Sequence, residues 1–227
     1  YMKLYHYTSF NTFIKIWHTK SLLFQPFYNV NDRLERSKFV RIPDSSSQSA
    51  DKLRELDEQL VQYRQISLVV DYNKRIKGFM SSMMWGHYGD RGNGVCIELE
   101  SDKLDLSLSS IKKDVVRYCD DIKAPMLQKE DDIANFIDTH INYLFFQKTK
   151  EWSGENEYRL ISNIQQKLDI SKAITAVYMF EHYRPETQTV LKLVGEDILH
   201  IVVPNRMTNG DGVSYPIKAF KWKHIIK

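Results

Sequence analysis

Apolar and polar residues alternate in several short stretches, which predicts β-strands, and a 3.6-residue period elsewhere predicts helices. The expected strands cover residues 3–7, 21–24, 77–82, 95–99, 115–119, the stretch that follows Glu155, 174–180, 198–203 and 213–220. The expected helices run from Thr8 or Ser9 to about His18, then over 50–66, 131–147 and 185–194, the last between Pro185 and Gly195. Strands outnumber helices, arrive in irregular order and form no repeat, so the predicted class is α+β. We expect a single compact domain over 1–227, with a mixed, mostly antiparallel sheet flanked by helices.

A charged helical segment interrupts this pattern at about residues 45–67. A polar run, PDSSSQS at 43–49, precedes it, and the helix has an apolar stripe of Leu53, Leu56, Leu60 and Tyr63. Two interpretations remain open: an insertion or lid over the core, or a solvated helix that packs on the body. Near the end of the chain, Asn209-Gly210 predicts a hairpin-like turn between the last two strands.

Two carboxylates lie at the start of a predicted apolar strand in the stretch KTKEWSGENEYRLIS, residues 148–162. Residues i and i+2 of a strand share a face, so Glu155 and Glu157 point the same way if the strand starts by Glu155. If Glu155 is still in the loop, the strand fixes Glu157 alone and Glu155 lies over it. Two neighbouring acids repel, which raises the pKa of one or commits it to a hydrogen bond. Glu157 is therefore a candidate general base or hydroxyl anchor. The alternative is a pair of solvated acids, with Arg159 as a structural salt-bridge partner.

An early histidine and a middle aromatic group are further candidates. His6 stands where a strand gives way to a helix, so it either contacts a ligand or lies satisfied in the core. Trp85, His87 and Tyr88 precede a glycine-rich turn at 89–94, and either line a pocket or brace it. The glycines lack the spacing of a phosphate-binding loop.

The composition of the chain limits its possible partners and cellular compartment. The 227 residues are 42% hydrophobic and 12% aromatic, with a net charge of +3, which permits a nucleic-acid partner without requiring one. No apolar run approaches the roughly 20 residues that span a bilayer, and no signal peptide is visible. Cys96 and Cys119 make no metal spacing, so we expect free thiols in a reducing cytoplasm.

Several signatures in one order resemble a known family. They are LYHYTS from Leu4, Asn31-Asp32 with Glu35, MWGHY from Met84, GVCI from Gly94, Glu151-Trp152 and ENEYRLI from Glu155. Over roughly residues 4–180 the chain resembles a bacterial family catalogued as domain of unknown function twenty-nine seventy-one. That family resembles a distant branch of the ADP-ribosyltransferase fold. In that fold a histidine or arginine, a polar or aromatic residue and a late glutamate surround NAD.

The resemblance implies roles for particular residues. His6 takes the first role, one of Ser81, Ser82, Trp85, His87 and Tyr88 the second, and Glu157 the third, with Glu155 beside it. A carboxylate near the ribose 2′-hydroxyl stabilises positive charge as the bond to nicotinamide breaks. Arg33, Arg91 or Arg159 would neutralise the pyrophosphate. The residues expected to contact NAD are His6, Tyr7, Thr8, Phe24, Ser81, Trp85, Tyr88 and Arg159.

The implied activity is transfer of ADP-ribose from NAD to RNA, DNA or protein, with single-stranded nucleic acid slightly favoured. The implied setting is a toxin or phage-defence effector, with an antitoxin or inhibitor protein as a further partner. Two other functions stay open. One is a non-catalytic module that binds a nucleotide or a partner through His6, Tyr88 and Glu157. The other, ranked lowest, is a metal-dependent nuclease that uses Glu155, Glu157, His87 and Asp90.

Overall fold

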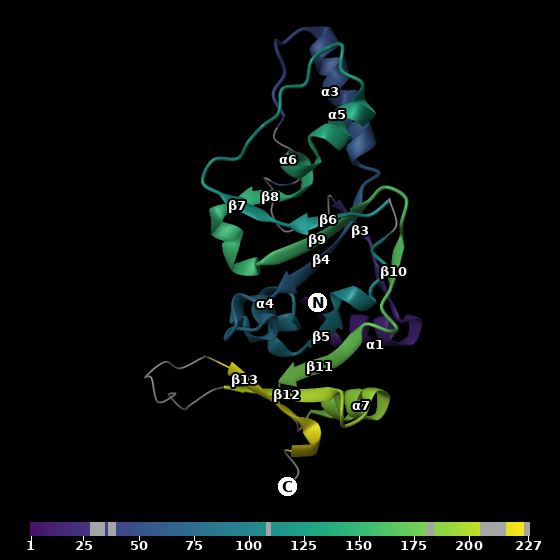
Figure 1. Cartoon of the computed structure of the whole chain (residues 1–227), viewed down its shortest axis with the longest axis vertical. Helices are drawn as coiled ribbons and strands as arrows, with labels where there is room; N and C mark the ends of the chain where they lie inside the picture. Colours follow the sequence, from purple (N-terminus) through teal and green to yellow (C-terminus); the bar gives the residue numbers. More distant parts are fainter. Residues whose placement is uncertain (28–34, 36–39, 108–109, 181–183, 205–216, 225–227) are drawn as a thin grey trace.

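A mixed sheet forms the centre of the protein (Figure 1). The computed structural model describes residues 1–27, 35, 40–107, 110–180, 184–204 and 217–224. The main sheet has the order β13-β12-β11-β5-β1-β4-β9-β6, with the short β3 beside β4. Its strands are β1 (Lys3–Thr8), β3 (Gln25–Pro26), β4 (Arg64–Val70), β5 (Val95–Glu100), β6 (Lys112–Val115), β9 (Glu157–Ser162), β11 (Ile174–Phe180), β12 (Leu199–Pro204) and β13 (Ile217–Lys221). Strands β11 and β12 run parallel and the other pairs run antiparallel.

Helices and two small ribbons surround this sheet. The helices are α1 (Phe10–Thr19), α3 (Ser47–Leu60), α4 (Ser82–His87), α5 (Ile133–Thr139), α6 (Ile141–Phe145) and α7 (Pro185–Val194). The ribbons pair β2 (Ser21–Leu23) with β10 (Lys167–Asp169) and β7 (Arg117–Cys119) with β8 (Gln147–Thr149). Short 3-10 turns are η2 (Gly78–Met80), η3 (Asp90–Gly92), η4 (Ser101–Lys103), η5 (Lys150–Glu155) and η6 (Trp222–His224). The predicted α+β class is confirmed: the protein is a single domain with a mixed, mostly antiparallel sheet and flanking helices.

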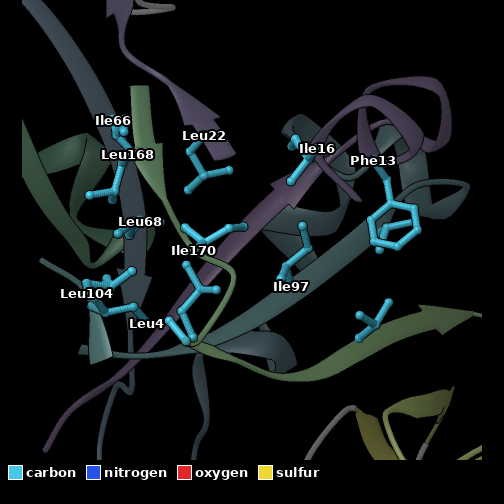
Figure 2. Close-up of a cluster of buried hydrophobic side chains, with 14 of the residues drawn as sticks. Leu4, Phe13, Ile16, Leu22, Ile66, Leu68, Ile97, Leu104, Leu168 and Ile170 are labelled. Carbon is cyan, nitrogen blue, oxygen red and sulfur yellow. The ribbon is translucent and has the colours of Figure 1, made fainter. Parts of the chain in front are cut away.

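Alternation along the strands divides the apolar core between the two faces of the sheet. Leu4 of β1 belongs to a cluster that contains Phe13 and Ile97 (Figure 2). Tyr5 and Tyr7, the odd-numbered neighbours on β1, belong to an aromatic cluster on the other face. A third cluster joins helices α3, α5 and α6 to Ile161 of β9. In Figure 1 these helices lie beyond β9 and β6, at the end of the molecule opposite β12 and β13.

The largest correction concerns the segment predicted as a helix at 50–66. Helix α3 begins after its cap Ser46 and ends at Leu60, and residues 64–70 form β4 in the middle of the main sheet. Ile66 and Leu68 are buried in the core and Val69 belongs to the aromatic cluster, so the end of the predicted insertion and the residues that follow it are core structure. Side-chain burial on both faces decides in favour of a strand, as expected for a central position.

A second correction concerns residues 77–82, which do not form a strand. Gly78 begins the 3-10 turn η2, and a side chain there would clash, because a Cβ would lie 2.2 Å from Cδ2 of Tyr5. Ser81 instead caps α4, and its hydroxyl accepts from the backbone N–H of Met84 at 3.2 Å.

Two further boundaries differ from expectation, and a third falls on residues that are not described. The long helix predicted at 131–147 is two helices, because His140 adopts non-helical angles (φ −105°, ψ 16°) between α5 and α6. The strand predicted at 115–119 is the end of β6 followed by β7. Strand β13 begins at Ile217, while residues 213–216 and the Asn209-Gly210 turn lie outside the described residues. No helix among the described elements is long and apolar enough to cross a membrane.

Candidate functional site

A cavity opens where two central strands separate. Strand β1 pairs with β5 at six positions and β4 pairs with β9 at six, whereas β1 and β4 pair only at Leu4↔Val70 and Tyr5↔Val69. Beyond Tyr5 a cavity of about 210 Å³ lies along β1 and β4. Its lining is Tyr5, His6, Tyr7, Leu23, Gln25, Gln65, Ile66, Ser67, Leu68, Val69, Met84, Tyr88, Lys148, Glu155 and Glu157. The volume is below the roughly 300–1,000 Å³ of pockets that enclose a whole small molecule. The cavity therefore has room for one end of a dinucleotide.

His6 lines this cavity together with Tyr5 and Tyr7, although its side chain lies on the opposite face of β1 from theirs. Burial lowers the pKa of its imidazole to about 4, and a hydrogen bond to the backbone of Ser67 only partly opposes this effect. Its Nδ1 atom is buried and has no hydrogen-bond partner among the described residues. His6 is therefore a neutral ring near pH 7 with one unused nitrogen.

A strained asparagine sets the direction of the two acids. Glu155 ends η5, Asn156 adopts left-handed angles (φ 45°, ψ 53°), and Glu157 begins β9. Asn156 holds this conformation by donating from Nδ2 to the carbonyl of Val70 at 3.0 Å, while the N–H of Val70 donates to the carbonyl of Asn156 at 3.0 Å. Asparagine tolerates the left-handed region better than most residues. Both carboxylates thereby face the ammonium of Lys148.

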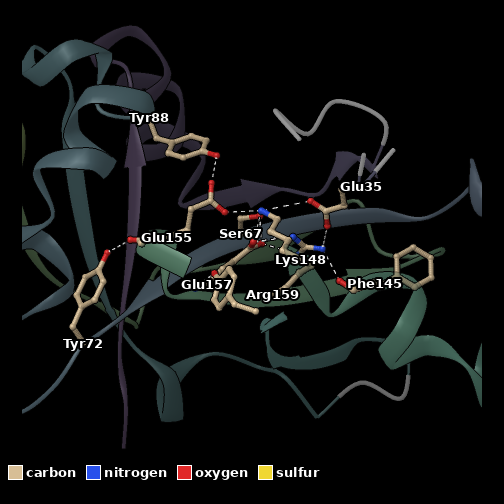
Figure 3. A network of polar contacts seen from close by, with 11 residues as sticks. Glu35, Ser67, Tyr72, Tyr88, Phe145, Lys148, Glu155, Glu157 and Arg159 are labelled. Carbon is tan, nitrogen blue, oxygen red and sulfur yellow. Dashed lines mark hydrogen bonds and ion pairs between the residues drawn. The ribbon is translucent and has the colours of Figure 1, made fainter. Parts of the chain in front are cut away.

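Five charged side chains interlock beside the cavity (Figure 3). The Lys148 ammonium lies 2.6 Å from Glu155, 2.9 Å from Glu157 and 3.5 Å from Glu35. The Arg159 guanidinium donates two parallel hydrogen bonds to the Glu157 carboxylate, from Nε to Oε1 at 2.7 Å and from Nη2 to Oε2 at 2.8 Å. Its Nη1 also pairs with Glu35 and donates to the carbonyl of Phe145 at 2.5 Å. All five side chains are buried.

These charges fix the protonation states. Burial raises the pKa of Glu157, but the charges of Arg159 and Lys148 and the hydrogen bonds from Arg159 and Ser67 outweigh burial and hold that pKa well below its usual range. Burial lowers the pKa of Lys148, yet Glu157 and Glu35 raise it above its usual value, so the amine stays protonated. Glu157 is therefore an anion near pH 7, and the expectation of a raised pKa is wrong for it. The hydrogen-bonded alternative holds, because Ser67 Oγ donates to Oε1 at 2.5 Å.

Two tyrosines complete the surroundings of the acid pair. The Tyr88 hydroxyl donates to Oε1 of Glu155 at 2.5 Å, and Tyr88 is the residue that caps the C-terminus of α4. The Tyr118 hydroxyl accepts from the backbone N–H of Glu157 at 2.9 Å. Burial raises the pKa of Tyr118, so its hydroxyl is a neutral hydrogen-bonding partner.

Several residues predicted to contact NAD lie away from the cavity. Arg159 has no exposed surface, and its partners are Glu157 and Glu35 instead of Glu155 or a pyrophosphate. Trp85 packs edge-on against Tyr7 at 5.1 Å and donates from Nε1 to the carbonyl of Phe79 at 2.8 Å, so it braces the pocket. Thr8 and Phe24 are buried but do not line the cavity, and Ser81 is a helix cap.

The remaining candidates are dispersed. His87, Asp90 and Arg91 are exposed beyond the cavity, and Arg33 lies outside the described residues. The carboxylates proposed as metal ligands with His87 and Asp90 are bridged by an ammonium instead. Within the described part of the chain, no group of three or more His, Cys, Asp or Glu side chains is placed to hold a metal ion.

The sequence did not single out three members of the network. Lys148 opens the stretch that contains both acids, and Glu35 belongs to one of the family signatures, so both signals were present in the sequence. Ser67 was missed because the preceding helix was extended through Ile66, which hid the central strand.

Fold and site together define an α+β protein with a divided sheet, whose central cavity is walled by a neutral histidine and a buried ion network. The family described as "Protein of unknown function (DUF2971)" matches residues 84–160, which include Tyr88, Lys148, both acids and Arg159. The predicted family is thereby confirmed over that segment. No curated protein matches the chain. No solved structure matches it.

Proposed function

We propose that the protein is an NAD-dependent ADP-ribosyltransferase whose cavity holds the nicotinamide riboside end of the dinucleotide. One observation supports this proposal above the others: His6 and Glu157, 151 positions apart, line the same cavity, with Ser67 between them. In the proposed reaction the bond between nicotinamide and ribose C1′ breaks with its electron pair on nicotinamide. An acceptor nucleophile then bonds to C1′ and loses its proton.

The charge of the network suits that reaction. Three carboxylates and two cations, with His6 neutral, leave a formal charge of −1 beside the cavity. Nicotinamide carries a positive charge while it is bonded to ribose, and the sugar gains positive charge as the bond breaks. A fixed anion in a site shielded from water stabilises that charge without reorganising. Glu157 needs no proton transfer for this role.

The neighbouring groups support the binding of nicotinamide riboside. Tyr7 and Tyr88 contribute aromatic rings to the lining, and the buried Nδ1 of His6 is an unused hydrogen-bond acceptor beside it. Because Arg159 is buried, the pyrophosphate would lie outside the cavity. The proposed acceptor is a macromolecule, RNA, DNA or protein. The proposed setting is a cytoplasmic toxin or phage-defence effector, with an antitoxin or inhibitor protein.

A matched pair of carboxylate variants tests the proposal. Glu157→Gln removes the fixed charge, whereas Glu98→Gln neutralises another buried carboxylate, which is held by Lys3, Thr175 and Tyr178 and does not line the cavity. With labelled NAD, we expect Glu157→Gln to slow nicotinamide release and label transfer by about 100-fold or more, and Glu98→Gln to retain both. Circular dichroism confirms that both variants fold. A wild-type protein that releases no nicotinamide with any acceptor would refute the proposal.

A second candidate function has one specific observation in its favour. Ser67, Arg159 and Lys148 already engage both oxygens of Glu157, which is the pattern of a structural anion. A non-catalytic module that binds a nucleotide or partner accounts for this pattern. Calorimetry with NAD, with nicotinamide followed in parallel, separates the two: tight binding without release favours the module.

A further inference from the structure

A second concavity, distinct from the central cavity, lies against helix α6. Its volume is about 430 Å³ and its lining is Arg41, Ile122, Lys123, Ala124, Pro125, His140 and Tyr143. None of these residues lines the central cavity. We call this surface the Arg41–Tyr143 groove.

The charged side chains of the groove are cationic. Arg41 and Lys123 are exposed, and among the described residues neither forms an ion pair. Arg41 Nε donates to the carbonyl of Ala124 at 3.0 Å, which holds the guanidinium against another residue of the groove lining. Of the carboxylates near these cations in sequence, Asp44 pairs with Lys129, Asp120 with Lys150 and Asp138 with Lys112, whereas the exposed Asp121 does not line the groove. Two unneutralised cations on a concave surface attract phosphate.

Aromatic rings form the other wall. Phe136, His140 and Tyr143 follow one another along α5 and α6, with ring centroids 4.6 Å and 6.2 Å apart. Phe136 is buried, whereas Tyr143 is 37% exposed and ends the series at the surface. An exposed ring beside cations is the combination that holds single-stranded nucleic acid, because bases stack on the ring while phosphates contact the cations.

Strand β8 connects this groove to the acid pair. The Gln147 side chain donates to the carbonyls of Lys123 and Tyr143, both at 2.7 Å, and so ties the two walls together. The next residue, Lys148, holds Glu155 and Glu157 from the opposite face of the strand. Both sites are therefore built on adjacent residues of one short strand.

We propose that the Arg41–Tyr143 groove binds single-stranded nucleic acid, with Arg41 and Lys123 on phosphates and Tyr143 stacked on a base. The role of the bound nucleic acid as the ADP-ribose acceptor rests on the proposed function. The binding of the nucleic acid to the groove does not.

Fluorescence anisotropy with a labelled single strand of about 12 nucleotides, without NAD, measures this binding directly. Tyr143→Ala is expected to weaken it about tenfold, and Tyr143→Phe to restore it, because the ring and not the hydroxyl makes the contact. Lys123→Gln is expected to lower the slope of log affinity against log salt by about 0.7, the value for one single-strand phosphate contact. These side chains are exposed, so the variants are expected to fold.

The matched controls lie at the far edge of the sheet. Lys218 stands over the ring of Phe220 at 5.2 Å, and Phe220 is 41% exposed, so this pair is also an exposed cation and ring. Lys218→Gln and Phe220→Ala are expected to leave affinity unchanged. The inference fails if no single strand binds at low salt, if the control variants weaken binding as much as the groove variants, or if a phosphopeptide competes as well as the strand does.

The two proposals fail separately. Nicotinamide release without nucleic acid reports on the central cavity alone, and we expect Tyr143→Ala to leave it unchanged. Groove-dependent binding by a protein that never cleaves NAD would retain this inference and remove the proposed activity. If the protein cleaves NAD but the groove variants leave nucleic-acid binding unchanged, the proposed activity would be retained and this inference removed.

Discussion

Removal of the Lys148 ammonium is the sharpest perturbation of the ion network. Lys148→Met keeps most of the side-chain volume but leaves Glu35, Glu155 and Glu157 around an apolar group, with Arg159 as the remaining cation. The formal charge of the network then changes from −1 to −2. Loss of one partner from a buried ion pair costs about 3–5 kcal/mol, because the other charge stays buried without compensation. Urea unfolding followed by circular dichroism at pH 7 measures this loss.

The pH dependence of stability gives a second readout with a defined sign. In the wild type the pKa of Glu157 is lowered in the folded state, so its contribution is present above the unfolded pKa and is lost as the pH falls below about 4.3. Without Lys148, repulsion and burial raise the pKa of one acid in the folded state. Stability of the variant relative to the wild type is then expected to fall as the pH rises from about 5 to 7, because the buried His6 contributes equally to both proteins over this range.

A double variant separates charge from packing. Adding Glu155→Gln to Lys148→Met removes one of the repelling charges and is expected to recover part of the loss, whereas Glu98→Gln is expected to recover none. A Lys148→Met penalty below about 1 kcal/mol, or an unchanged pH dependence, would refute the description of Lys148 as the cation that holds the acids together.

Three other variants or measurements test the surroundings of the acids. Ser67→Ala removes a hydrogen bond to a buried carboxylate and is expected to cost about 1.5–3 kcal/mol in urea unfolding; a neutral result would contradict the contact with Glu157. Asn156→Ala and Asn156→Gly both lose the bond to Val70, but alanine is also strained at φ 45°, so it is expected to be about 1 kcal/mol less stable than glycine. By nuclear magnetic resonance His6 is expected to stay neutral from pH 8 to 5, since its pKa is about 4; a transition near pH 6.5 would show an unburied ring.

Sequence patterns correctly predicted the helices and strands whose start and end signals lie within a few residues of the element itself. Helix α7 begins and ends at the residues that its Pro185 and Gly195 signals indicated, and β11 has the predicted bounds. Strand β4 was missed because the apolar stripe of the preceding helix continues through Tyr63 to Ile66 without a glycine or proline to interrupt it. Only burial between β1 and β9 distinguishes that segment as a strand.

The site was predictable in its acids but not in their pairing. Spacing identified Glu155 and Glu157 as neighbours, and the structure directs both at Lys148. Sequence could not decide that Arg159 would bind Glu157 and Glu35 instead of Glu155 or a ligand, because Glu35 lies 124 positions away and folding alone brings it close. Aromatic residues near a site are equally ambiguous, and Trp85 proved to be a brace.

The division between β1 and β4 has a mechanical consequence. Two paired positions join the half of the sheet that carries His6 to the half that carries the acids, and each half is fastened internally by a six-position ladder. The seam can therefore act as a hinge: a slight tilt of one half changes the width of the opening while both ladders stay intact. The fit of a molecule in the cavity would then depend more on the angle between the two halves of the sheet than on the mobility of any single side chain.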